Sequence, residues 1–204
     1  LSYGDFIKNR CTVFLKENNR VLEEVSIFSN RHLNRFLHYE ILSPLKRGVY
    51  SFASVLVDGQ IYIVGGSTSC GPFQSNIRST LFWEKYSNMM YRYDIKQDKW
   101  ETIRHKFRER AYHTAGYYDG KIFILGGKRL SETRIVDYLD NAIEIYDIKR
   151  DTVWTDYTNP HQATLLGSVV YKDNMIVLGG VKKVLQNNEG VYSDEMHLWN
   201  LKSG

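Results

Sequence analysis

The chain has 204 residues, enough to bury a substantial core as one domain, and its hydrophobic content of 43% is ordinary for a globular protein. The formal net charge of +4 is too small to indicate nucleic-acid binding by itself. No apolar run is long enough for a membrane-spanning helix, and the first residues lack the apolar centre of a signal peptide. Two cysteines and the absence of an Asn-x-Ser/Thr sequon favour a reducing, cytoplasmic setting.

The start of the chain predicts an incomplete first unit over residues 11–46. Residues 1–10 are interpreted either as the tail of a preceding segment or as a disordered start. Strand-like runs follow at residues 12–15 and 21–28, and residues 37–42 are predicted as an outer strand. Because the first residue is Leu1 rather than Met, we expect either a fragment of a longer chain or a truncated gene product.

The next unit, residues 47–106, contains a β-hairpin whose turn is Asp58-Gly59, since Gly adopts positive φ without steric cost. Its predicted strands are residues 50–57, 60–64, 90–93 and 99–103. The long connection over residues 67–89 contains Cys70-Gly71-Pro72, which cannot continue a strand. Connections of this length inside compact domains are usually functional or mobile.

Two further units repeat this hairpin. In residues 107–160 the turn is Asp119-Gly120, and the predicted strands are residues 112–118, 121–125, 142–146 and 153–157. In residues 161–204 the turn is Lys172-Asp173, and the predicted strands are residues 164–171, 174–178 and 195–201. The connections after the hairpins are residues 128–141 and 181–193.

Each hairpin ends in a glycine doublet, and Tyr-Asp and Trp landmarks follow at similar offsets in the second and third units. Recurrence of such landmarks at about 50 residues indicates a repeat architecture. The glycines would allow close packing of sheets, and Trp100 and Trp154 would bridge neighbouring sheets, so we favour a structural role over a ligand site. The residues of this signature are Gly65, Gly66, Tyr93, Trp100, Gly126, Gly127, Tyr146, Trp154, Gly179 and Gly180.

These landmarks resemble kelch repeats, in which each repeat is one blade of a β-propeller. The resemblance implies an all-β fold, a partial kelch β-propeller of about three and a half four-stranded antiparallel blades over residues 11–204. Propeller rings have about four to eight blades, so the chain would supply only part of a ring. The degenerate first unit is similar to that of kelch-like proteins, in which the propeller follows BTB and BACK domains. The Asn-, Lys- and Tyr-rich composition is similar to that of poxvirus members of this group, which implies a host–virus interaction.

No catalytic, metal or cofactor site is predicted. The histidines show no pair at the ligand spacing of a helix or hairpin, and His113 is assigned a structural role inside its hairpin. The glycine doublets lack the strand, loop and helix context of a phosphate-binding loop. An enzyme with its site at the central channel of a propeller is retained only as an alternative.

Basic residues in the connections are the candidate binding residues. If the chain forms a propeller, they should cluster near one rim, where Arg can bind a carboxylate or phosphate in bidentate fashion. One interpretation is a solvated rim, and the other is a site for an acidic segment of a target protein. Base-stacking aromatic residues are not interleaved with these charges, which disfavours nucleic acid. The candidates are Arg78, Arg104, His105, Arg108, Lys128, Arg129 and Arg134.

The resemblance implies a protein–protein interaction module rather than an enzyme. BTB-kelch relatives act as substrate adaptors of cullin-based ubiquitin ligases, in which the BTB domain holds the cullin and the kelch face holds the substrate. No BTB segment is present in this sequence, so contact with a cullin would require a domain outside it. The alternative is an actin-binding or cytoskeletal kelch protein.

Overall fold

The computed structural model describes residues 38–68, 85–133, 136–184 and 190–203. Residues Ile41–Gly204 form one compact unit, and the described part of it consists of strands and turns without a helix. The predictions for residues 1–37 lie outside the described residues. Residues 38–42 are not in a strand, so the outer strand predicted over 37–42 is wrong for the part that can be compared.

The first sheet contains four antiparallel strands in sequence order, β1 (Ala53–Val57), β2 (Gln60–Val64), β3 (Met90–Asp94) and β4 (Lys99–Thr102). The turn between β1 and β2 places Asp58 at φ 47° and Gly59 at φ 77°. Two consecutive left-handed residues form the turn type that matches the twist of a two-stranded hairpin. The Asp-Gly pair therefore fixes the register in which Val57 faces Gln60.

The second sheet has the same order, with β5 (Thr114–Tyr118), β6 (Lys121–Leu125), β9 (Ile143–Asp147) and β10 (Thr152–Asp156). The third sheet has three strands, β11 (Gly167–Tyr171), β12 (Asn174–Leu178) and β15 (Met196–Asn200). Short ribbons interrupt the connections after β6 and β12. They are β7 (Lys128–Leu130) with β8 (Asp137–Leu139), and β13 (Val181–Val184) with β14 (Gly190–Tyr192).

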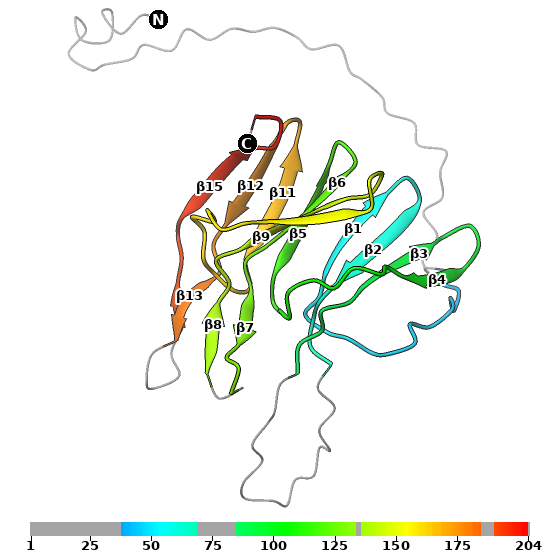
Figure 1. Ribbon diagram of the computed structural model, residues 1–204, viewed down its shortest axis with the longest axis horizontal. Helices are drawn as coiled ribbons and strands as arrows, with labels where there is room; N and C mark the ends of the chain where they lie inside the picture. The colour runs from blue at the N-terminus through cyan, green and yellow to red at the C-terminus, as the bar shows by residue number, and fades with distance from the viewer. Residues whose placement is uncertain (1–37, 69–84, 134–135, 185–189, 204) are drawn as a thin grey trace, which may run out of the picture. The chain divides into compact units, whose positions relative to one another are not determined.

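The three sheets fan outward like the blades of a propeller (Figure 1). The first strand of each blade is the innermost, and β5 lies beside both β1 and β11. The prediction of an all-β, partial propeller is confirmed. The described residues supply two four-stranded blades and one three-stranded blade.

The backbone connects consecutive blades at the start of each inner strand. Tyr112 N–H donates to Ser51 O over 2.8 Å, and Leu165 N–H donates to Tyr112 O over 2.9 Å. All three residues have positive φ, at 54° for Ser51, 60° for Tyr112 and 57° for Leu165. This left-handed residue explains why the inner strands begin two to three residues later than predicted, since a strand requires negative φ.

The glycine doublets lie where one blade approaches the next. Gly127 has φ 80°, and a Cβ atom there would lie 2.5 Å from the carbonyl oxygen of Ala111. Its N–H donates to Ala163 O in the connection to the next blade, over 2.8 Å. Gly66 repeats this bond one unit earlier, donating to Arg110 O over 2.9 Å. A side chain at either position would collide with the segment that precedes the inner strand of its own blade, Tyr50 and Phe52 for Gly66 and Ala111 and His113 for Gly127.

The hydrophobic core fills the two spaces between blades. Ile122, Ile124 and Tyr146 pack with Met90 and Phe107 between the first and second blades. Leu125, Met175 and Val177 pack between the second and third blades, with Trp199 partly buried against them. Trp154 differs from expectation, because it lies on the outer strand β10 and is 42% exposed. It does not bridge two sheets.

Candidate protein-binding face

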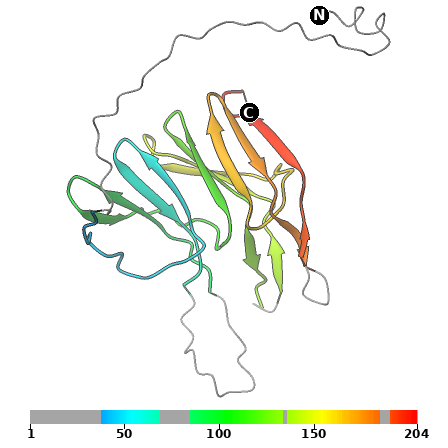
Figure 2. The same cartoon turned by 180° about the vertical axis from the view of Figure 1, so that it is seen from behind.

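The two ends of the blades differ in what they carry. Hairpin turns, at Asp119-Gly120 for example, lie at one end, which we call the turn face. The ribbons β7–β8 and β13–β14 lie at the other end (Figures 1 and 2). We call this end the loop face; it comprises the two ribbons and the chain segments 50–52, 111–113 and 164–166 that precede the inner strands.

Isolated bridges hold the loop face against the blades. Ala111 pairs with Lys128, and Thr164 pairs with Val181, so the residue after each glycine doublet is hydrogen-bonded to the segment before an inner strand. The doublet thus leads the chain out of the core and directly into a ribbon. Because backbone hydrogen bonds fix each ribbon at its base, side chains on the ribbon are held by the blade rather than by a free loop.

Lys128 connects the β7–β8 ribbon to the centre of the loop face. Its ammonium nitrogen Nζ lies 2.9 Å from Asp137 Oδ2 in β8. The same atom lies 4.9 Å from the ring centroid of Tyr112 and 5.8 Å from that of Tyr86. A cation over aromatic faces is attracted by their quadrupoles. Lys128 is therefore held in place by contacts within the chain.

Arg129 projects from the neighbouring position of the ribbon. Its guanidinium carbon Cζ lies 5.2 Å from the ring centroid of Tyr138, and Tyr138 is 47% exposed. The Nε of Arg129 is buried and has no hydrogen-bond partner among the described residues. A guanidinium held over an aromatic ring keeps its planar set of donors, which suits it to bind a carboxylate.

Arg108 is placed in a buried ionic network rather than on an open rim. Its Nε donates to Asp140 Oδ2 over 3.0 Å, and its backbone N–H donates to Glu144 Oε1 over 2.9 Å. Arg110, only 1% exposed, donates from Nη2 to Glu144 Oε2 over 2.8 Å and from Nη1 to Ala142 O over 2.9 Å. Burial raises the pKa of Glu144 and lowers the pKa of Arg110, and each partner's charge opposes the shift.

This network was missed in the sequence because its members are far apart along the chain. The residue that signals it is Glu144, a charged residue between Ile143 and Ile145 in a strand that is otherwise apolar. Removing one partner of such a network leaves an uncompensated buried charge. Arg108 is thus committed to the fold and is not a free cation for a partner.

The remaining basic candidates do not join one cluster. Arg104 is exposed after the end of β4. His105 Nε2 lies 2.6 Å from Asp151 O and 3.1 Å from Asp151 Oδ1, in the β9–β10 turn on the turn face. Arg78 and Arg134 lie outside the described residues. Of the seven candidates, Lys128 and Arg129 are the two that the structure brings together on the loop face.

His113 is buried where two glycine doublets meet. A Cβ at Gly65 would lie 2.7 Å from its Cε1, and a Cβ at Gly127 would lie 2.7 Å from its Cβ. Burial, together with the positive charge of the nearby Arg110 guanidinium, lowers the pKa of His113 to about 3. The ring is therefore neutral at ordinary pH and fills the space between blades. Within the described ranges, a group that could hold a metal ion lies elsewhere, at His161, Glu195 and His197.

The fold is that of a partial β-propeller, with its connections gathered on the loop face. Residues 49–105 match the Kelch motif family. The chain is 25% identical over 187 residues to Kelch-like protein 40 of Xenopus laevis, covering 91% of this chain and 26% of that protein. It is 29% identical over 117 residues to the F-box/kelch-repeat protein At4g39560 of Arabidopsis thaliana, covering 57% of this chain and 36% of that protein.

The chain is therefore similar to kelch-repeat proteins, including kelch-like ones, and it spans about a quarter to a third of the length of these relatives. Among solved structures, YjhT is similar, with a TM-score of 0.54 at 15% identity over 70% of this chain and 47% of that chain. This likeness concerns the fold alone. Within the described ranges, no helix has the length and apolar composition that crossing a membrane requires.

Proposed function

We propose that this chain recognises a target protein through its loop face and has no enzymatic activity of its own. The observation that carries the proposal is the pairing of Arg129 with the half-exposed ring of Tyr138 on a ribbon anchored to the second blade. Tyr and Arg are the residue types enriched among those that dominate binding energy at protein interfaces. A rigid support reduces the entropy lost when such side chains are immobilised by a partner.

The partner that fits this surface carries an acidic segment. The guanidinium of Arg129 presents a planar fork of donors beside the Tyr138 ring. Lys128 adds positive charge one residue away, although Asp137 balances part of it. A carboxylate placed against Arg129, with an apolar group against Tyr138, would use both side chains.

In the cell, we propose that the chain supplies the substrate-recognition part of an adaptor for a cullin-based ubiquitin ligase. This follows the resemblance to kelch-like proteins, and relatives include proteins named for both F-box and kelch repeats. A cullin would be held by a separate BTB domain, so the role of this chain is limited to the target.

Affinity capture from cell extract, followed by mass spectrometry, tests the proposal. The variants are Arg129→Glu and Arg129→Met, the latter removing the charge while keeping an apolar stem. The control is Lys149→Glu, which matches the charge change of Arg129→Glu at an exposed residue of the β9–β10 turn on the opposite face. We expect both Arg129 variants to weaken binding of the captured target by about 30-fold, the size of an interface hot spot, and the control to bind normally.

Equal capture by wild type and by both Arg129 variants would exclude the loop-face site. If the wild type and both Arg129 variants co-sediment equally with actin filaments, the cytoskeletal role is favoured over the adaptor role. Circular dichroism of each variant shows whether a loss of binding comes with a loss of fold.

A further inference from the structure

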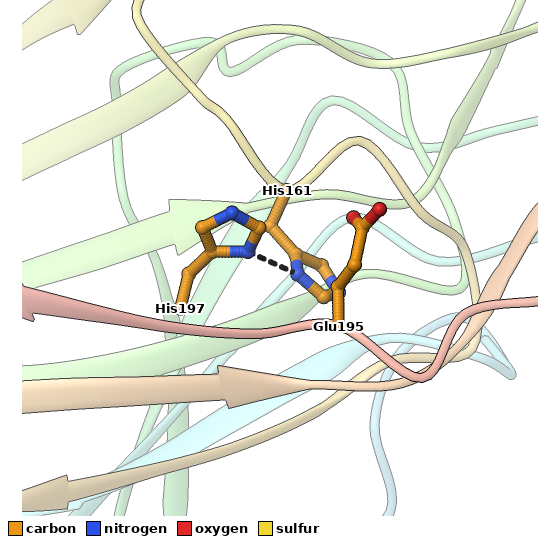
Figure 3. A group of neighbouring side chains, drawn as sticks. All are labelled: His161, Glu195 and His197. Atoms are coloured by element: carbon orange, nitrogen blue, oxygen red, sulfur yellow. Dashed lines mark hydrogen bonds between the residues drawn. The ribbon is translucent and has the colours of Figure 1, made fainter.

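Two histidines and a glutamate meet beside the outer strand of the third blade. His161 lies in the connection between β10 and β11. His197 lies in β15, and Glu195 is the residue just before that strand. The Nδ1 atoms of His161 and His197 are 2.9 Å apart, and the ring planes are inclined by 81° (Figure 3). The candidate ligand atoms of the three side chains all lie within 4.8 Å of one another.

Gly179 orients two members of this group. Its carbonyl oxygen lies 2.8 Å from His161 Nε2, so that Nε2 carries the proton and donates it. Its N–H donates to Glu195 O over 3.1 Å, which fixes the backbone of the glutamate. His161 is 1% exposed, so its Nδ1 lone pair faces only the neighbouring group, where it accepts from His197 Nδ1–H.

This arrangement is the one that a metal-binding histidine usually has. Such a histidine donates its second ring N–H to a backbone carbonyl or carboxylate, which fixes the tautomer and the direction of the lone pair. In His161 the Gly179 carbonyl does this, and the lone pair on Nδ1 is directed at His197. His197 is half-buried, so its Nε2 can carry the proton toward solvent when Nδ1 binds a metal.

The unit of residues 107–160 contains counterparts of His161 and His197, which the backbone hydrogen bonds identify. Gly127 N–H donates to Ala163 O as Gly66 N–H donates to Arg110 O, which makes His161 the counterpart of Arg108. Ser193 N–H donates to Gly180 O as Asp140 N–H donates to Gly127 O, which makes His197 the counterpart of Glu144.

Arg108 and Glu144 are joined in the buried ionic network, with Arg108 N–H donating to Glu144 Oε1 over 2.9 Å. The repeat thus brings these two positions together in both units. In the second blade the contact belongs to an ionic network, and in the third the same place holds two imidazoles and a nearby carboxylate.

We propose that His161 Nδ1, His197 Nδ1 and the Glu195 carboxylate bind one Zn²⁺ ion. Imidazole nitrogen suits zinc, whereas Mg²⁺ and Ca²⁺ prefer oxygen ligands. Two nitrogens bound tetrahedrally at the usual zinc distance are about 3.3 Å apart, about 0.4 Å more than the present spacing. Each ring would also tilt so that its lone pair points at the shared ion rather than at the other nitrogen.

Glu195 is exposed and can complete the set by a side-chain rotation, since Lys182 Nζ contacts only its Oε1, at 3.1 Å. Water would occupy the fourth position. The ion would fasten the β10–β11 connection to β15, the contact that the ionic network makes in the second blade.

Zinc titration of the purified chain by isothermal calorimetry tests the proposal. The test variants are His197→Gln and Glu195→Gln, and the control is His105→Gln, which removes a histidine from the connection between the first two described blades. All proteins carry Cys11→Ser and Cys70→Ser, because thiolates also bind zinc.

We expect one zinc per chain, with a dissociation constant raised at least about 100-fold by His197→Gln, about 10-fold by Glu195→Gln, and unchanged by His105→Gln. X-ray absorption of the zinc-loaded protein should show two imidazoles in a shell of nitrogen and oxygen. Glu195 is exposed, so its variant keeps the test valid if His197→Gln does not fold. Absence of binding, or equal affinity in wild type and both test variants, would overturn the assignment.

Discussion

Acid should destabilise this chain through His113. The ring is buried between Gly65 and Gly127 with its pKa lowered to about 3, against about 6.5 in an unfolded chain. Between pH 6.5 and pH 3 the His113 imidazole is protonated in the unfolded state and neutral in the folded state. The free energy of unfolding therefore falls as the pH drops below about 6.5, and it stops falling at about pH 3.

The size of the effect follows from the two pKa values. pH 5 lies about 1.5 units below the unfolded-state pKa of His113 and well above its folded-state pKa of about 3. At about 1.36 kcal/mol per pH unit, the free energy of unfolding is therefore about 2 kcal/mol lower at pH 5 than at neutral pH. For a domain of this size that loss lowers the melting temperature by several degrees.

Urea unfolding at pH 7, 6 and 5 measures this loss in the wild type and in His113→Gln, which cannot titrate at this position. The variant is expected to start less stable and to lose about 2 kcal/mol less between pH 7 and pH 5. Contributions from other groups are common to both proteins and cancel in the comparison. Parallel pH profiles of the two proteins would refute the assignment of a neutral, buried imidazole.

Replacing Arg110 by Met should cost about 3–5 kcal/mol in urea unfolding, because the buried carboxylates that it pairs with lose their partner; a cost below 1 kcal/mol would contradict this. Gly127→Ala should cost about 2–4 kcal/mol through strained φ and contact with a carbonyl oxygen, whereas Gly48→Ala, which meets nothing within 4 Å, should be neutral within about 0.5 kcal/mol. Trp154→Ala should cost only about 1 kcal/mol, since Trp154 is 42% exposed, and Ile124→Ala at a fully buried site should cost about 2–5 kcal/mol; the reverse order in thermal unfolding would contradict the packing described for these blades.

The repeat was predictable because its signals are local. A turn pair such as Asp119-Gly120 and a doublet such as Gly126-Gly127 each depend on the conformation of adjacent residues. The starts of the inner strands were less predictable, since nothing in the side chain of Tyr112 or Leu165 favours positive φ. Contacts between blades impose that conformation on them.

The ionic network and the histidine pair depend on contacts between distant positions that the sequence does not display. Arg108 and Lys128 look equally available in the sequence, yet Arg108 pairs with Asp140, 32 positions away, and Lys128 pairs with Asp137 across the β7–β8 ribbon. His161 and His197 are 36 positions apart and belong to different elements. The short strands β7 and β8 have too few residues to show an alternating pattern.

The backbone bonds from Tyr112 to Ser51 and from Leu165 to Tyr112 have a consequence for how the molecule opens. Each blade is tied to its neighbour at the start of its inner strand, so the outer strand of a blade can fray while the inner strands stay together. Hydrogen exchange should therefore be slowest at the backbone amides of Tyr112 and Leu165. Stabilising either neighbouring blade should slow exchange at both amides, as expected for coupled repeats.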